Sequence, residues 1–132
     1  MDDQPDDSPF RKLGLRLLVS SGSNAVVILE KLWKDFSKFP RKDLASLAKW
    51  MNIWCDGELH LPPERYKMLG KIGEYRIDEF KSYQSRAYGT IATNWDGRTF
   101  VVTALATKKS DDADPAVLKR AARLATELRL ER

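Results

Sequence analysis

Hydrophobic and polar positions in the second half of the chain follow the alternation that is typical of strands. Residues 73–80, 85–93 and 99–109 read GEYRIDEF, SRAYGTIAT and TFVVTALATKK, and an Asp96-Gly97 turn separates the last two. The last segment carries β-branched and apolar residues on both faces, as a central strand does. These positions predict three consecutive antiparallel strands.

A C-terminal helix is predicted after the strands. The segment SDDADP at residues 110–115 interrupts the strand pattern, with Asp114 as the N-cap and Pro115 as the first helical residue. Apolar residues then recur at helical spacing and define a buried face. They are Val117, Leu118, Ala121, Leu124, Ala125 and Leu128.

Two further helices are predicted in the first half of the chain. Apolar residues between Ala25 and Phe36 recur with a period of 3.6, and Pro40 ends that segment. A second amphipathic helix follows and closes at Asp56-Gly57. Its apolar face consists of Leu44, Leu47, Ala48, Met51 and Trp54. Two such helices, joined by about five residues, predict a helical hairpin.

The order of these elements predicts the fold class. Residues 11–20 alternate as a first strand, so the chain reads strand, helix, helix, three antiparallel strands, helix. Residues 64–69 are expected to form only a short turn. We therefore expect an α+β fold, in which an N-terminal helical hairpin packs on a small twisted antiparallel sheet and a C-terminal helix follows.

Length and charge refine this picture. The 132 residues are 42% hydrophobic, which fits one folded domain at residues 10–132, preceded by a disordered acidic tail at residues 1–9. The net charge is +4, and the tail holds four Asp and no basic residue, so the domain alone carries +8. A basic domain favours a polyanion such as nucleic acid as its partner. The alternative is an ordinary surplus of Lys and Arg.

Several kinds of site are excluded by residue counts. One His and one Cys rule out a zinc site with several His or Cys ligands, and no glycine-rich phosphate loop occurs. We expect no metal and no cofactor. His60 is expected to have a surface or packing role, and Cys55 to be a small buried hydrophobe. A lone Cys fits a cytoplasmic setting, and the sequence has no apolar run long enough for a membrane helix.

Cations inside the predicted strands are the candidate site. If the first two strands pair, Arg76 and Arg86 both point to the sheet face that the helices leave uncovered. Arginine binds phosphate bidentately and could stabilise the charge that develops as an RNA 2′-hydroxyl attacks the adjacent phosphate. Tyr88 could stack on a base or assist proton transfer. Alternatively, Arg76 forms an ion pair with Glu74 or Asp78 and Arg86 is merely solvated.

More cations extend this candidate site. Lys108 and Lys109 follow the end of the central strand. Lys119, Arg120 and Arg123 lie close together on the C-terminal helix, because residues three and four apart are neighbours on a helix. We treat Lys108 and Lys109 as candidate catalytic residues together with Arg76, Arg86 and Tyr88. The three helix cations are candidate RNA-binding residues.

These residues match a family pattern. The runs LGKIGEYRIDEF, SRAYGTIATN and TFVVTALATKKSDDADPAVLKRAARLATEL resemble the RelE/ParE superfamily of type II toxin–antitoxin toxins, in particular its HigB-like, phage-derived branch. The similarity covers about 60 residues of the sequence. Ser85 and Ala106 stand where the family pattern has aromatic residues.

The resemblance implies a RelE-like fold and a toxin function. Its activity would be that of an mRNA endonuclease, or mRNA interferase, which cleaves by 2′-hydroxyl attack without a metal ion. The implied partners are mRNA, either free or on the ribosome, and a cognate antitoxin of the helix-turn-helix type. The alternative is a non-catalytic or degenerate toxin-like binding protein, which would be gyrase-directed or a phage accessory factor.

Overall fold

A mixed β-sheet with a helix on each face forms the centre of the molecule. The computed structural model describes residues 8–57, 60–108 and 113–132, and within them six strands pair in the order β1-β2-β6-β5-β4-β3. The strands are β1 (Leu15–Ser21), β2 (Asn24–Leu29), β3 (Tyr66–Ile72), β4 (Tyr75–Ser82), β5 (Ser85–Ala92) and β6 (Thr99–Thr107). All neighbours are antiparallel except β2 and β6, which are parallel.

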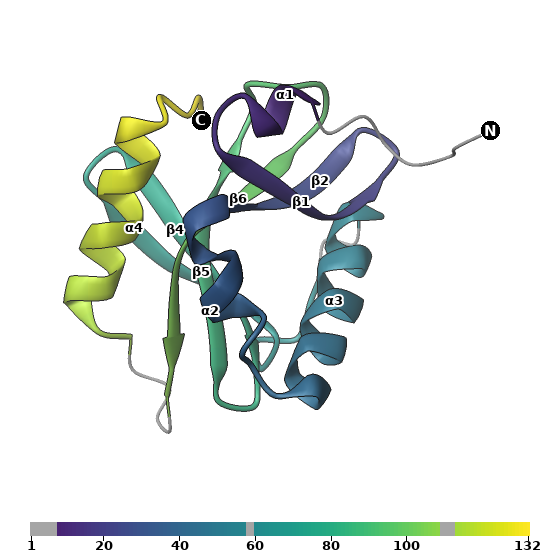
Figure 1. Ribbon diagram of the computed structural model, residues 1–132. Helices are drawn as coiled ribbons and strands as arrows, with labels where there is room; N and C mark the ends of the chain where they lie inside the picture. Colours follow the sequence, from purple (N-terminus) through teal and green to yellow (C-terminus); the bar gives the residue numbers. More distant parts are fainter. Residues whose placement is uncertain (1–7, 58–59, 109–112) are drawn as a thin grey trace.

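The two long helices cover opposite faces of this sheet (Figure 1). α3 (Arg41–Cys55) packs on β1, β2 and β4, whereas α4 (Pro115–Glu127) packs mainly on β6, β5 and β4. The short segments are α1 (Ser8–Arg11), a 3-10 turn (Glu30–Leu32) and α2 (Trp33–Phe36). The sheet therefore separates two hydrophobic cores, one beneath each long helix.

The predicted N-terminal helical hairpin on a small twisted antiparallel sheet is wrong, and with it the expected RelE-like arrangement. Residues 24–29 form strand β2, and only short helical turns follow it before α3. Ala25 to Leu29 are all buried, because successive residues face one core and then the other. A continuous apolar run satisfies a helical period as well as a strand period, and the β-branched Val26, Val27 and Ile28 favour the strand.

Several predicted elements are confirmed. β4, β5 and β6 are consecutive antiparallel strands, and Gly97 adopts a positive φ in the turn before β6. α3 ends at Cys55 with Asp56 as its C-cap, and α4 begins at Pro115 with the Asp114 side chain accepting a hydrogen bond from Ala116 N. The first predicted strand is also present, but it begins at Leu15, after α1.

The predictions for residues 64–69 and for the N-terminal tail differ from the structure or lie partly outside the described residues. Strand β3 stands where only a short turn was expected at residues 64–69, and its burial does not alternate because the register shifts between Met68 and Gly70. Of the predicted disordered tail, residues 1–7 lie outside the described residues, and Ser8 and Pro9 belong to α1.

Among the helices of the described residues, none combines the length and apolar character that crossing a membrane requires.

The side chain of Asn24, the first residue of β2, connects that strand to the end of α3 and to the turn before β6. Its side-chain amide donates to Cys55 O at 2.9 Å, and its Oδ1 accepts from Arg98 N at 2.8 Å. Nearby, a Cβ added at Gly97 would lie 2.3 Å from Ser23 O, so only glycine fits there. These contacts fix the end of α3 and Arg98 beside the sheet, where the candidate site lies.

Candidate nucleic-acid interface

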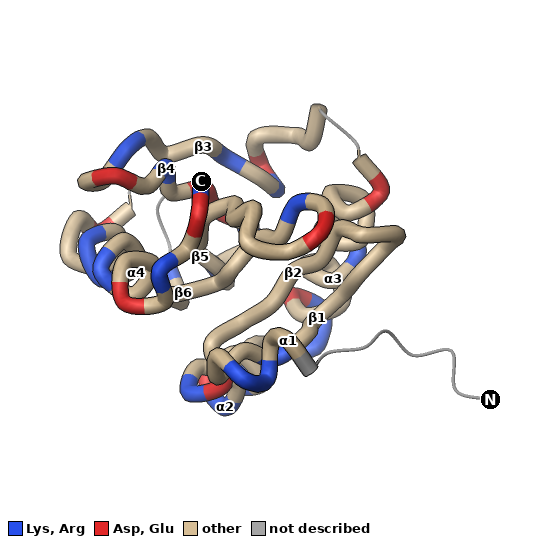
Figure 2. The backbone as a smooth tube through the Cα atoms, turned by 90° about the horizontal axis from the view of Figure 1, so that it is seen from above, with Lys and Arg blue, Asp and Glu red and all other residues tan. Residues whose placement is uncertain are grey.

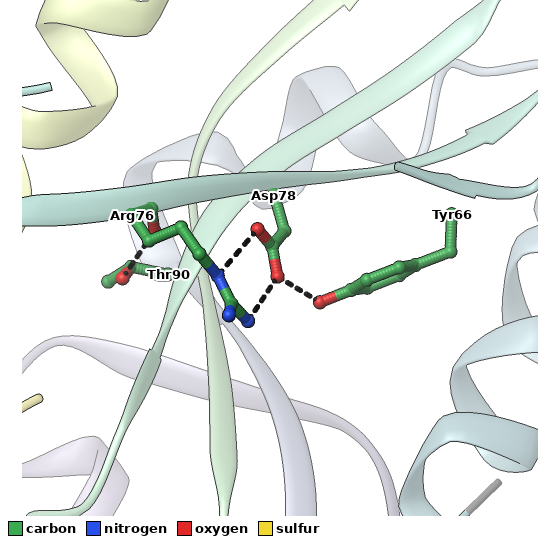
Figure 3. Close-up of polar contacts among 4 residues, drawn as sticks. All are labelled: Tyr66, Arg76, Asp78 and Thr90. Carbon is green, nitrogen blue, oxygen red and sulfur yellow. Dashed lines mark hydrogen bonds and ion pairs between the residues drawn. The ribbon is translucent and has the colours of Figure 1, made fainter. Parts of the chain in front are cut away.

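Arg76 is held in a polar network on the α3 face of the sheet (Figure 3). Its Nε donates to Asp78 Oδ1 at 3.0 Å and its Nη2 donates to Asp78 Oδ2 at 2.9 Å, while the Tyr66 hydroxyl donates to the same Oδ2. Thr90 Oγ1 donates to Arg76 O at 2.8 Å. Asp78 is fully buried, whereas 49% of the Arg76 side chain is exposed. The network therefore fixes the guanidinium with one edge open to solvent.

The protons of this network are firmly held. Partial burial alone would lower the pKa of Arg76, but the hydrogen bonds and the charge of Asp78 raise it above its ordinary value. Burial raises the pKa of Tyr66, and the nearby Asp78 carboxylate raises it further. Arg76 thus remains a cation, and Tyr66 remains a hydrogen-bond donor. A guanidinium has five N–H groups, so Arg76 can bind an anion while it holds Asp78.

Two surface hollows meet at Arg76, and we call them together the Arg76 groove. The first hollow has a volume of about 350 Å³ and lies next to the end of α3. Besides Arg76, its lining residues are Trp54, His60, Leu61, Tyr66, Met68, Ile91 and Arg98. The second hollow measures about 610 Å³. It shares Arg76 and Ile91 with the first, and its other lining residues are Lys71, Glu74, Thr90, Thr93 and Arg132.

Cations stand on both sides of Arg76 along this groove. In the first hollow, the Arg98 guanidinium lies over the Trp54 ring, 4.7 Å from its centroid. In the second hollow, Arg132 Nη1 donates to Glu74 O at 2.9 Å, and exposed Lys71 comes from β3. Asp78 neutralises the charge of Arg76 itself, so the net positive character of the groove comes from these flanking residues. The spacing of several cations along a groove suits a chain of phosphates.

Arg86 and Tyr88, by contrast, lie on the other face of the sheet, beneath α4. Arg86 is 4% exposed, its Nη1 donates to Tyr83 O, and its Nε lies 3.8 Å from Glu79 Oε2. Tyr88 is fully buried in the α4 core. The expectation that Arg76 and Arg86 share a face uncovered by helices is wrong. The pairing of Lys81 with Arg86 and the strand alternation put Arg86 beside Glu79, opposite Arg76 and Asp78.

Burial also governs the chemistry of this second cluster. It raises the pKa of Glu79, while the positive charges of Lys81 and Arg86 act in the opposite direction. Burial likewise raises the pKa of Tyr88, and the neighbouring Glu79 carboxylate raises it further. A phenol that is buried and holds its proton this firmly is poorly suited to stacking on a base or to proton transfer at neutral pH.

Lysine and arginine residues are distributed over many elements of the backbone (Figure 2), and the remaining described candidates do not line the Arg76 groove. Lys108 is partly buried at the far end of β6, where its backbone N donates to Gln84 O at 2.8 Å, and Lys109 lies outside the described residues. Lys119, Arg120 and Arg123 are carried by α4, which covers the face opposite the Arg76 groove. Of the predicted site residues that the structure describes, only Arg76 lies in that groove.

The roles of three single residues follow from the same geometry. Arg76 forms the ion pair with Asp78 that the sequence allowed. Cys55 is buried, as expected, and burial raises the pKa of its thiol to about 12. His60 is exposed and lines the first hollow. In the part of the chain that the structure describes, no three His, Cys, Asp or Glu side chains gather closely enough to hold a metal ion.

Sequence reasoning missed most of the residues around Arg76. Tyr66, Met68 and Lys71 come from β3, which was not predicted as a strand, and Arg98 precedes β6 in a turn. The sequence carries no clear period-two signal for β3, and the position of Tyr66 opposite Phe80 in a buried aromatic cluster appears only in the structure.

Comparison of the chain with known protein families, with curated proteins and with solved structures finds no match.

Proposed function

We propose that this protein binds RNA through the Arg76 groove and acts as a toxin-like binding protein. The observation that carries the proposal is the fixed, half-exposed Arg76 guanidinium, which stands between two hollows that each present a further cation. Asp78 and Tyr66 orient the guanidinium before any ligand arrives, which lowers the entropic cost of binding a phosphate. The open groove and its charge suit a flexible polyanion.

The toxin part of the proposal rests on the order of the sequence motifs. It implies a cytoplasmic protein that meets mRNA, free or on the ribosome, and a helix-turn-helix antitoxin that neutralises it. The geometry favours binding over cleavage, because Arg86 and Tyr88 are buried beneath α4. Toxicity then follows from the binding of RNA in the groove and not from its cleavage.

RNA cleavage is the second candidate function, and the position of His60 in the first hollow favours it. Its imidazole lines the same hollow as Arg76 and Arg98. An imidazole can accept a proton from a 2′-hydroxyl near neutral pH, and the two guanidinium groups can stabilise the charge on the attacked phosphate. Such a step forms the bond from the 2′-oxygen to phosphorus and breaks the bond to the 5′-oxygen, which takes a proton from water and leaves as a 5′-hydroxyl; the other product is a 2′,3′-cyclic phosphate.

Removal of the Arg76 charge tests the binding proposal. We expect the double variant Arg76→Gln/Asp78→Asn, which leaves no buried charge unpaired, to weaken binding of a single-stranded RNA about tenfold, because a hydrogen bond to a charged phosphate is lost. The dependence of log K on log salt should change little, because the double variant removes one positive and one negative charge together. Fluorescence anisotropy over a salt series measures both quantities.

The matched control is Lys119→Gln, which removes one positive charge on the opposite side of the molecule. It should change RNA affinity less than about twofold, because exposed charges beyond a Debye length are screened. A larger loss with Lys119→Gln than with the groove variant would place the RNA on α4 and sink the proposal for the groove.

Cleavage is tested with the same RNA. If the second candidate function holds, a denaturing gel will show products with cyclic-phosphate ends, and His60→Gln will reduce their rate by about 100-fold or more. His60→Gln keeps a polar side chain at an exposed position, so the fold is expected to be unaffected. Intact RNA after prolonged incubation with the wild-type protein would leave binding as the function.

A further inference from the structure

We infer that the Arg76 groove accepts an unpaired nucleotide, with its base in the first hollow and its phosphate on Arg76. The inference rests on the proposed function and names its ligand class: single-stranded RNA, not duplex RNA. It follows from the types of side chain that line the two hollows: aromatic and aliphatic residues predominate around the first, charged residues and threonines around the second, and Arg76 belongs to both.

The first hollow has walls that suit a base. Leu61, Met68 and Ile91 contribute apolar side chains to it, and Met68 is 64% exposed on the edge strand β3. An exposed methionine is a flexible, polarizable surface that favours contact with an aromatic ring. Arg98 adds a planar guanidinium at the same hollow, and guanidinium planes stack on bases.

The second hollow suits the phosphate chain. Lys71, Arg76 and Arg132 line it, together with Thr93, whose hydroxyl already donates to Glu131 O at 3.4 Å and to Arg132 O at 3.3 Å. Because Arg76 belongs to both hollows, a nucleotide whose base fills the first hollow has its phosphate at Arg76, and the next phosphate continues toward Lys71 and Arg132. Glu74 is the single acidic residue among the lining residues of this hollow.

A duplex does not meet this requirement. In A-form RNA the bases are stacked inside the helix, and the phosphates lie on its outside. A paired base must first break its pair and leave the stack before it can enter a hollow beside the arginine that binds its own phosphate, and this costs free energy. A strand with unpaired bases places both groups without that cost, and stacking on side chains then adds affinity with little dependence on sequence.

Three probes of about eight nucleotides test the inference, a length within the site size of small single-strand binders. They are a single-stranded RNA, its blunt duplex, and an abasic sugar–phosphate chain of the same length. We expect the single strand to bind about tenfold or more tightly than either other probe, because each stacked base contributes substantially. Anisotropy at one fixed salt concentration gives the three affinities.

A variant locates the base. Met68→Ala should weaken binding of the single strand about threefold or more, through lost apolar contact, while binding of the abasic chain and the salt dependence stay unchanged. Leu13→Ala is the matched control, because Leu13 is 43% exposed and lies outside both hollows. It should leave all three affinities as they are.

The outcomes separate the two proposals. Equal affinity for the single strand and the duplex, with the Arg76 variant still weaker, would overturn the unpaired-base inference and leave RNA binding by the groove intact. Equal affinity for the RNA strand and the abasic chain would overturn it as well. Absence of binding to all three probes at low salt would remove the proposed function, and the inference with it.

Discussion

Replacement of Gly89 by alanine is expected to destabilise the domain strongly. Gly89 lies in β5 at the sheet centre, where the pairing with β6 shifts register between Tyr88 and Gly89. A Cβ at this position would lie 2.1 Å from Val101 O and 2.8 Å from Phe100 Cε1. Backbone of a central strand cannot move aside without breaking its own pairing. We expect a loss of about 3 kcal/mol or more in the free energy of unfolding, a large part of the stability of a small domain.

The measurement is urea unfolding followed by far-UV circular dichroism, together with the soluble yield. Gly73→Ala is the control, because Gly73 has a φ of +63° in the β3–β4 turn but nothing within 4 Å of an added Cβ. That substitution carries only the backbone cost of a left-handed residue, about 1–2 kcal/mol. Equal unfolding midpoints for the two variants would show that the close approach at Gly89 is not a constraint.

Phe80→Ala is expected to have the next largest effect. Phe80 is fully buried on the α3 face, with ring centroids at 4.8 Å from Tyr66, 4.8 Å from Phe100 and 6.4 Å from Trp54. The truncation leaves a cavity among these rings, which typically costs about 3–5 kcal/mol. For a domain of this size the melting temperature should fall by roughly 10–20 °C.

Phe80 also supports the Arg76 groove from below. Tyr66 packs edge-on against Phe80, and its hydroxyl donates a hydrogen bond to Asp78. We therefore expect Phe80→Ala to weaken RNA binding even at temperatures where the variant is folded. Phe39→Ala is the comparison, because Phe39 is only partly buried at the edge of the same core and should cost less. A wild-type melting temperature for Phe80→Ala would contradict this packing.

The fold could be predicted where local signals agree with each other. Asp114 and Pro115 fix the start of α4, and the alternation around the Asp96-Gly97 turn fixes the β5–β6 pair. β2 could not be predicted in this way, because a strand buried on both faces has no alternation, and its partner β6 is remote in sequence. β3 carries a register shift that removes the period-two signal.

The candidate site was predictable to a smaller extent. Arg76 is recognisable as a cation within a strand, and its ion pair with Asp78 follows from their two-residue spacing. The side of the sheet on which Arg86 lies depends on the register of β4 against β5, and that register cannot be read from either strand alone. Lys71 reaches the groove because β3 pairs it with Arg76, and Arg98 reaches it from the turn before β6, which is distant in sequence.

The parallel pairing of β2 with β6 has a consequence for the order of folding. β2 meets its partner only when Ala25 pairs with Thr99, after β3, β4 and β5 have come between them in the chain. At a synthesis rate of about 5–20 residues per second, β6 is completed several seconds or more after the apolar run Val26–Leu29 has been synthesised. Because the β1–β2 hairpin joins the rest of the sheet only through β6, it cannot dock before β6 has been synthesised. Until it docks, the nascent chain exposes an apolar strand edge, which favours aggregation or the binding of a chaperone.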